Sequence, residues 1–158
     1  MQKNQWTFVT IAVAAVFLVV FAANVQAKTY KMASSLAITG PTSDAGAPYA
    51  KGMEDYARYA NDQKILGGDT VEMIIRDDQY KTDVTKRNFE EFLGQGIVIY
   101  LNYSTGSTLG LKRDFEEEKM PTLPASFHRG NLDDSNYIFL PITSYSGQCI
   151  ALAEYLVK

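Results

Sequence analysis

Cysteine, histidine and tryptophan are nearly absent from the sequence, with one residue of each among 158. The lone cysteine, Cys149, excludes an internal disulfide bond, and its helical context predicts a small buried residue rather than a reactive thiol. A single histidine without cysteine partners cannot supply the usual ligands of a zinc site, so we expect no bound metal. The sequence also lacks a Walker A motif, and it lacks a G-x-G-x-x-G after its first predicted strand, so it gives no sign of a nucleotide cofactor.

Neither sign of charge dominates the sequence. Lysine and arginine together number 15 and aspartate and glutamate 18, which gives a net charge of −3 at pH 7. A mildly acidic chain lacks the concentrated positive charge that attracts a phosphate backbone, so nucleic acid is not expected as a partner. With 46% hydrophobic and 21% charged residues, the sequence has the composition of an ordinary globular domain.

The sequence has one long apolar run, residues 8–23, close to its N-terminus. Lys3 precedes this run, and residues 25–27 (Val-Gln-Ala) follow it with the small-x-small pattern of a signal-peptide cleavage site. A membrane anchor usually needs about 20 apolar residues, so residues 1–27 predict a signal peptide that is cleaved after about Ala27. No cysteine follows that point to accept a lipid. We therefore expect a freely diffusing periplasmic protein that meets the membrane only transiently.

From residue 28 onward, strand patterns alternate with helix patterns. The predicted strands are residues 30–38, 70–76, 97–101, 121–127 and 137–140. Helical patterns of crossover length separate the first four strands, and a last helix follows the fifth. This order predicts an α/β fold, a doubly wound parallel sheet with helices on both faces in three α-β-α layers. The chain stops inside its last predicted helix, which we interpret as the front part of a longer protein.

Each predicted helix has a recognisable start and, in the first, a recognisable face. The expected starts are Pro48 in a first turn, Thr82 or Asp83, the residues near Leu109, and Ser144 or Ser146. The first helix carries an apolar stripe, which we expect to pack in the core rather than to serve as a stacking platform for a ligand. Its members are Tyr49, Met53, Tyr56, Ala57 and Ala60.

Two acidic residues, Asp77 and Asp78, close the second predicted strand. Such a pair could bind a divalent metal or accept a phosphoryl group. We interpret it instead as a pair that caps a turn and a helix, since export removes a protein from cytoplasmic phosphotransfer.

The stretch that best indicates function is the third predicted strand and the loop after it. Residues 97–101 form a continuous apolar run, which is typical of a strand buried on both faces of a parallel sheet. Residues 102–108 then change abruptly to serine and threonine. Ligands of open α/β sheets bind beyond the carboxyl ends of the strands, so this loop could hold a small anionic group without any catalytic chemistry.

Several short motifs, in this order, resemble the first lobe of the type I periplasmic binding proteins that serve ABC transporters of the leucine, isoleucine and valine class. They are Thr39-Gly40-Pro41, Ile65-Leu66-Gly67-Gly68, Asp77-Asp78-Gln79, Ser104-Thr105-Gly106-Ser107, Met120-Pro121, Ala125-Ser126 and Gln148 before Ala151-Leu152-Ala153-Glu154-Tyr155. The resemblance covers residues 28–158. It implies one ligand-binding lobe, with the second lobe of the family fold absent from this sequence.

The resemblance also implies a function and a site. The chain would capture an amino acid or a related small carboxylate or amide and deliver it to an inner-membrane ABC permease. The ligand's carboxylate and ammonium would be held by residues in the loops after the third and fourth strands, and a residue after the fifth strand is a weaker candidate for the cleft. These are Thr105, Ser104 and Ser107, then Ser126, Phe127 and His128, and last Tyr145.

Three positions depart from the family pattern and leave the ligand open. His128 stands where branched-chain binders usually carry threonine, Phe127 replaces a small residue, and Ala45 replaces an aromatic residue of the cleft wall in some relatives. An aromatic acid, another carboxylate, an amide or urea would fit such a site as well as a branched-chain amino acid.

Two other functions remain as alternatives. The first is a sensor that reports its ligand to a receptor. The second is an exported serine hydrolase, which the sequence disfavours. Ser107 and Ser126 lack a G-x-S-x-G motif, and His128 is too close to them in sequence for the usual dispersed triad. We therefore predict a binding protein that is not an enzyme.

Overall fold

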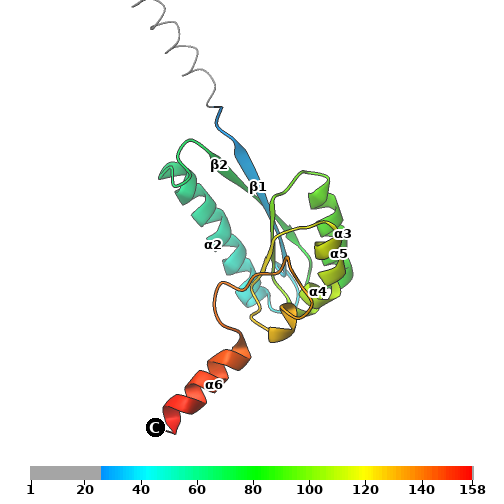
Figure 1. The fold of residues 1–158 in the computed structure, drawn as a ribbon. Coiled ribbons are helices and arrows are strands. Elements are labelled where there is room, and N and C mark those ends of the chain that lie inside the picture. The colour runs from blue at the N-terminus through cyan, green and yellow to red at the C-terminus, as the bar shows by residue number, and fades with distance from the viewer. Residues whose placement is uncertain (1–25, 158) are drawn as a thin grey trace, which may run out of the picture.

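The computed structural model describes residues 26–157, which form a parallel sheet with helices on both of its faces (Figure 1). The sheet has the strand order β2-β1-β3-β4. Its strands are β1 (Thr29–Leu36), β2 (Thr70–Asp77), β3 (Ile99–Asn102) and β4 (Thr122–Pro124). The predicted α/β class with its doubly wound parallel sheet is confirmed. The predicted signal peptide lies almost entirely outside the described residues.

Helices connect successive strands and divide between the two faces of the sheet. They are α2 (Ser43–Asp62), α3 (Thr82–Leu93), α4 (Thr105–Gly110), α5 (Lys112–Glu117) and α6 (Tyr145–Leu156), with a short 3₁₀ helix η1 (Arg129–Asn131). Figure 1 shows α2 on one side of the sheet, with α3, α4 and α5 on the other. Helix α6 extends away from the rest of the fold, and Ser144 caps it as predicted, accepting a hydrogen bond from the Gly147 N–H. Among the described residues, no helix is long and apolar enough to cross a membrane.

The main core lies between the sheet and the α3–α5 layer. Tyr100 of β3 is fully buried and contacts Phe89 of α3 and Phe115 of α5, with ring centroids 5.0 Å and 5.7 Å away. Burial raises the pKa of the Tyr100 hydroxyl because the charged phenolate would be desolvated. This aromatic cluster fixes β3 in the middle of the sheet, so the loop after β3 leaves from a rigid base.

The opposite face of the sheet is only partly covered, which contradicts two predictions. Of the predicted core stripe on α2, only Ala60 is buried, and Tyr56 is 65% exposed. Leu101 of β3 is likewise half-buried on this side, so β3 is not enclosed on both faces. The reason is that, among residues 26–157, α2 alone covers this face, and it packs chiefly against β2 at the sheet edge.

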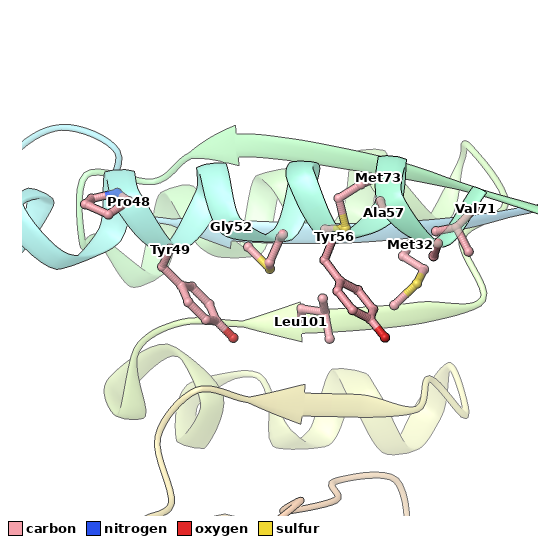
Figure 2. Close-up of a pocket in the computed structure, with 11 residues that line it drawn as sticks. Met32, Pro48, Tyr49, Gly52, Tyr56, Ala57, Val71, Met73 and Leu101 are labelled. Atoms are coloured by element: carbon pink, nitrogen blue, oxygen red, sulfur yellow. The ribbon is translucent and has the colours of Figure 1, made fainter. Parts of the chain in front are cut away.

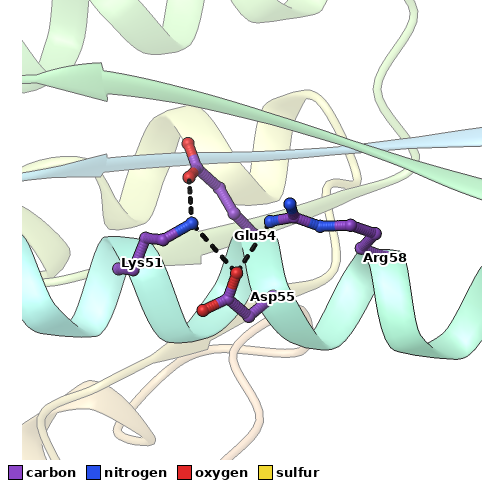
Figure 3. A network of polar contacts seen from close by, with 4 residues as sticks. All are labelled: Lys51, Glu54, Asp55 and Arg58. Atoms are coloured by element: carbon purple, nitrogen blue, oxygen red, sulfur yellow. Dashed lines mark hydrogen bonds and ion pairs between the residues drawn. The ribbon is translucent and has the colours of Figure 1, made fainter.

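The other side of α2 is polar. Lys51 lies 3.0 Å from Asp55, and Arg58 lies 2.7 Å from the same carboxylate, with Glu54 beside them (Figure 3). All of these side chains are exposed. Exposed ion pairs contribute little to stability, so this cluster marks the solvated face of the helix rather than a site.

Helix α2 begins five residues earlier than predicted, at Ser43, so Pro48 lies inside the helix instead of in its first turn. The early start depends on Gly46, which lies directly against the end of β1. A Cβ atom at Gly46 would be 2.0 Å from the carbonyl oxygen of Ala37. This contact joins segments that the local sequence pattern does not relate, so the pattern could not reveal it.

The prediction of a fifth strand at residues 137–140 is wrong. This segment forms one parallel bridge, between Thr122 and Ile138, instead of a strand. Glu116 of α5 limits the pairing at the N-terminal end, because its carboxylate accepts hydrogen bonds from the N–H groups of Asn136 (2.7 Å) and Tyr137 (3.2 Å). Those donors are therefore not free to extend a ladder with β4.

Three smaller predictions are also corrected. Neither Thr82 nor Asp83 caps α3, because the N-cap position is Lys81 and no side chain caps it there. Cys149 is exposed rather than buried, because every residue of α6 is exposed or half-exposed. The helix predicted near Leu109 begins at Thr105 and is interrupted at Leu111.

Candidate ligand-binding site

A polar hollow of about 260 Å³ lies where the carboxyl ends of the strands meet. The loops that follow all four strands contribute to it, as expected for the ligand edge of an open parallel sheet. Its lining residues are Thr42, Tyr80, Tyr103, Ser104, Thr105, Ala125, Ser126 and Tyr145. Because no lysine, arginine, aspartate or glutamate is among these described residues, the hollow offers hydroxyl and backbone groups rather than charge.

Thr105 and Ser126 form the centre of this hollow. Their hydroxyl oxygens are 2.5 Å apart, although Thr105 begins α4 after β3 and Ser126 lies in the loop after β4. Parallel pairing of Leu101 with Leu123 brings these two segments side by side. Two adjacent hydroxyls can both donate to a carboxylate, or one can donate while the other accepts from an ammonium group.

A buried hydrogen-bond network beneath this pair holds the β3 loop in place. The amide nitrogen of Asn102 donates to the hydroxyls of Ser107 (3.0 Å) and Thr108 (2.8 Å). Ser104 caps α4 by accepting from the Ser107 N–H at 3.0 Å. Ser107 is therefore a buried supporting residue, whereas Ser104 both supports the loop and lines the hollow.

Aromatic rings form much of the remaining wall. The ring of Tyr103 lies 6.1 Å from that of Tyr49 and 6.2 Å from that of Tyr80. Tyr145 packs edge-on against Phe127, with centroids 5.8 Å apart. The hollow thus combines hydroxyl groups with tyrosine rings, a combination that can bind a small solute with one charged end and one apolar part.

The structure brings together four of the seven predicted site residues: Thr105, Ser126, Ser104 and Tyr145. Among the described residues, the lining of the hollow does not include Ser107, Phe127 or His128. His128 instead caps η1, where its Nδ1 accepts a hydrogen bond from the Gly130 N–H at 3.1 Å.

Sequence reasoning missed Thr42, Tyr80, Tyr103 and Ala125 as lining residues. All four follow the carboxyl ends of strands, so the rule that led to Thr105 and Ser126 could have identified them. The serine- and threonine-rich composition that marks the site in the sequence does not single out the two tyrosines.

The acidic pair at the end of β2 holds turns together, as predicted, but neither residue caps α3, whose N-cap position has no side-chain cap. Asp77 accepts hydrogen bonds from the backbone N–H groups of Thr39 (3.1 Å) and Gln79 (3.0 Å), and Asp78 accepts from the Thr85 hydroxyl at 2.8 Å. Burial raises the pKa of the Asp78 carboxyl, although the bond from Thr85 acts in the opposite direction. Within residues 26–157, no group of three or more His, Cys, Asp or Glu side chains could hold a metal ion.

A second, larger hollow of about 480 Å³ lies between α2 and the sheet (Figure 2). Figure 2 shows Tyr49 and Tyr56 of α2 on one side and Leu101 of β3 opposite them. Methionine, alanine, valine and proline side chains complete its lining. Specific binding sites need a few well-placed polar groups to orient a ligand. The described lining is almost wholly apolar, so the smaller hollow is the better candidate for a polar solute.

Comparison with known proteins identifies relatives of this chain. The chain is similar to a branched-chain amino acid ABC transporter protein from Thermus thermophilus, solved with bound valine, at 46% identity and a TM-score of 0.76 over 84% of this chain. A substrate-binding protein of an ABC transporter from Aeropyrum pernix matches at 25% identity and a TM-score of 0.74 over 82% of this chain. A possible leucine/isoleucine/valine-binding protein from Rhodopirellula baltica shares the fold, at 21% identity and a TM-score of 0.73 over 86% of this chain.

The match covers 35% of the Thermus thermophilus and Aeropyrum pernix chains and 37% of the Rhodopirellula baltica chain. This chain therefore spans about a third of the length of these relatives. No curated protein sequence matched it. The family model described as periplasmic binding protein matches residues 29–158. Since that match includes well over half of the sequence, the chain belongs to the periplasmic binding protein family.

Proposed function

We propose that this chain is the first ligand-binding lobe of the substrate-binding component of an ABC importer. In this proposal, residues 1–27 are a cleaved signal peptide, and residues 28–158 capture an amino acid or a related small solute in the periplasm. A second lobe would close over the ligand, and the loaded protein would deliver it to an inner-membrane permease. The 46% identity to a valine-bound ABC transporter protein supports this role.

The observation that carries the proposal is the hydroxyl pair of Thr105 and Ser126 in a hollow whose described lining has no charged side chain. Neutral donors and acceptors suit a zwitterion, because they can satisfy a carboxylate and an ammonium together without favouring either charge alone. The ligand's own opposite charges then remain close to each other, which lowers the cost of moving them out of water.

We propose an apolar amino acid such as valine as the ligand. Phe127 and His128, which distinguish this sequence from the branched-chain binders, do not line the described hollow. The departure at these positions therefore gives no reason to reject a branched-chain ligand. Aromatic acids, amides and urea remain useful comparison compounds in a binding screen.

We also propose that the protein is not an enzyme. The hydroxyl of Ser126 is paired with Thr105, and the hydroxyl of Ser107 with Ser104 and Asn102. His128 Nδ1 accepts from a backbone N–H. No hydrogen bond within residues 26–157 joins either serine to this histidine, so the described chain shows no activated nucleophile. A turnover assay on generic ester and amide substrates should show no signal that Ser126→Ala removes.

The test uses the full-length protein of this proposal, with both lobes. It is titrated with valine, other amino acids, amides and aromatic acids, and binding is measured by thermal shift and calorimetry. A ligand at 100 times its Kd should stabilise the protein by about 2.7 kcal/mol. Thr105→Val and Ser126→Ala should each weaken binding by tenfold or more, because each leaves a charged ligand group without a partner. The matched control is Thr29→Val, because Thr29 is an exposed threonine at the end of β1 that lies away from the hollow. A protein that binds none of these compounds, or variants that bind as well as the wild type, would contradict the proposal.

A further inference from the structure

Two consecutive residues at the edge of the hollow, Gln79 and Tyr80, have left-handed backbone conformations, with φ angles of 54° and 61°. This conformation costs a residue with a side chain roughly 1–2 kcal/mol. A single such residue is unremarkable in a turn, but two in succession need surrounding contacts to hold them. Backbone strain of this kind collects at ligand-binding positions.

The adjacent carboxylates of Asp77 and Asp78 supply those contacts. Asp77 accepts the N–H of Gln79 at 3.0 Å, and Asp78 accepts the N–H of Tyr80 at 2.8 Å. Asp78 is itself completely buried and is held by the Thr85 hydroxyl of α3 at 2.8 Å. The direction in which Tyr80 leaves the backbone is thus fixed by a buried acceptor anchored on a helix.

The turn presents the ring of Tyr80 to the hollow. Tyr80 is 44% exposed, lines the hollow, and meets Tyr103 nearly edge-on at 75°. Among the described residues its hydroxyl makes no hydrogen bond, so the ring itself is the available surface. Tyr80 is thus a large, exposed aromatic side chain beside a polar hollow, and its backbone is held in an unfavourable conformation. These features suit a residue that contacts a ligand.

We propose that Tyr80 is a specificity-determining residue that packs against the apolar side chain of a bound amino acid, and that Asp78 is the positioning residue that holds Tyr80 there. This inference rests on the proposed function, because Thr105 and Ser126 must first hold the charged end of the ligand. The ring of Tyr80 then favours ligands with a branched aliphatic side chain over those with a small one.

The test measures valine and alanine affinity of the full-length protein by calorimetry. Tyr80→Ala should raise the Kd for valine by about tenfold, in the range of an aromatic contact residue, and the Kd for alanine by less. The preference for valine over alanine should therefore shrink. Tyr80→Phe keeps the ring and should keep the preference. Tyr59→Ala, a tyrosine on α2 that lines neither hollow, should change neither affinity.

The positioning role of Asp78 has its own variants. Asp78→Asn retains an oxygen that can accept the Tyr80 N–H and should preserve the valine preference. Asp78→Ala removes the acceptor and should reproduce the loss seen in Tyr80→Ala. In the Tyr80→Ala variant, adding Asp78→Ala should cause no further loss of valine affinity, because both changes act through the same ring. A purely structural role would instead add its cost in either background.

The outcomes separate this inference from the proposed function. If the wild type binds valine and Tyr80→Ala binds it equally well with an unchanged preference, the inference is wrong and the proposed function stands. A loss of preference in Tyr80→Phe would also overturn it, because the ring would then not be the contact. If the wild type binds no amino acid, the proposed function fails and the inference fails with it. Should Asp78→Ala not fold, Asp78→Asn and the Tyr80 variants still decide.

Discussion

Gly46 shows how much the position of α2 depends on one residue. Its missing side chain allows the helix to reach the backbone of β1, where a Cβ would be 2.0 Å from the Ala37 carbonyl oxygen. Gly52, further along the same helix, has no neighbouring atom within 4 Å of the corresponding point. Two glycines in one helix therefore have opposite roles, since one permits contact and the other merely lowers helix propensity.

Gly46→Ala should destabilise the protein, by roughly 1–3 kcal/mol, because the added methyl group must push α2 away from β1. Gly52→Ala should stabilise it by about 0.5–1 kcal/mol through reduced backbone entropy in the unfolded chain. Thermal unfolding of the two variants, compared with the wild type, measures both effects. Equal melting temperatures for the two variants would contradict the close approach of α2 to β1.

Among the connections between elements, the carboxylate of Glu116 in α5 makes several of the hydrogen bonds that hold the segment after η1. Glu116 accepts the Ser135 hydroxyl at 2.8 Å as well as two backbone N–H groups of that segment. The hydrogen bond from Ser135 is the main cause that lowers the pKa of Glu116, and the bonds from Asn136 add to it. Folding therefore favours the ionised form of this side chain.

This linkage predicts how the segment responds to acid. A carboxyl with a lowered folded pKa stabilises the structure above its unfolded pKa of about 4.3, and this stability is lost as the pH falls through the folded value. Amide-exchange protection at residues 136 and 137 should therefore be lost as the pH falls from this unfolded value through the lower folded one. Glu116→Gln should reduce the protection at neutral pH and remove its pH dependence. Glu118→Gln, an exposed neighbour, is the control, and the same pH profile in both variants would contradict the assignment.

Features of the structure that depend on neighbouring residues could be predicted from the sequence, whereas features that depend on contacts between segments could not. The four strands and the helices between them were predictable, because hydrophobic periodicity is a property of neighbouring residues. The start of α2 and the shortening of the fifth strand involve Gly46 and Glu116, whose partners belong to other segments of the chain. Likewise, Thr105 and Ser126 could be placed in one hollow from topology alone, whereas the direction of Tyr80 depends on a buried acceptor and a left-handed turn.

At the scale of the whole molecule, two apolar surfaces remain open. One is the hollow of about 480 Å³ between α2 and the sheet, and the other is α6, where Ile150, Leu152 and Tyr155 are all exposed. Large exposed apolar patches on a soluble domain usually mark surfaces that contact another part of a protein. The described residues do not cover either surface.

Residues 28–158 produced alone should therefore associate with themselves and bind valine weakly. Association would bury the open apolar surfaces, and one lobe would leave half of the ligand exposed to water. Size-exclusion chromatography with light scattering measures the first effect, and calorimetry measures the second. Leu152→Lys combined with Tyr155→Lys should reduce the association. A stable monomer that binds valine with micromolar affinity would contradict both expectations.

The neutral lining of the polar hollow has a consequence for how such a protein would work outside the cytoplasm. Dissolved ions weaken attraction between a charged surface and a charged solute, but a zwitterion approaching hydroxyl groups and tyrosine rings offers them little to screen. If the hollow binds a zwitterion as proposed, the rate of binding should stay steady as the salinity of the surroundings rises and falls.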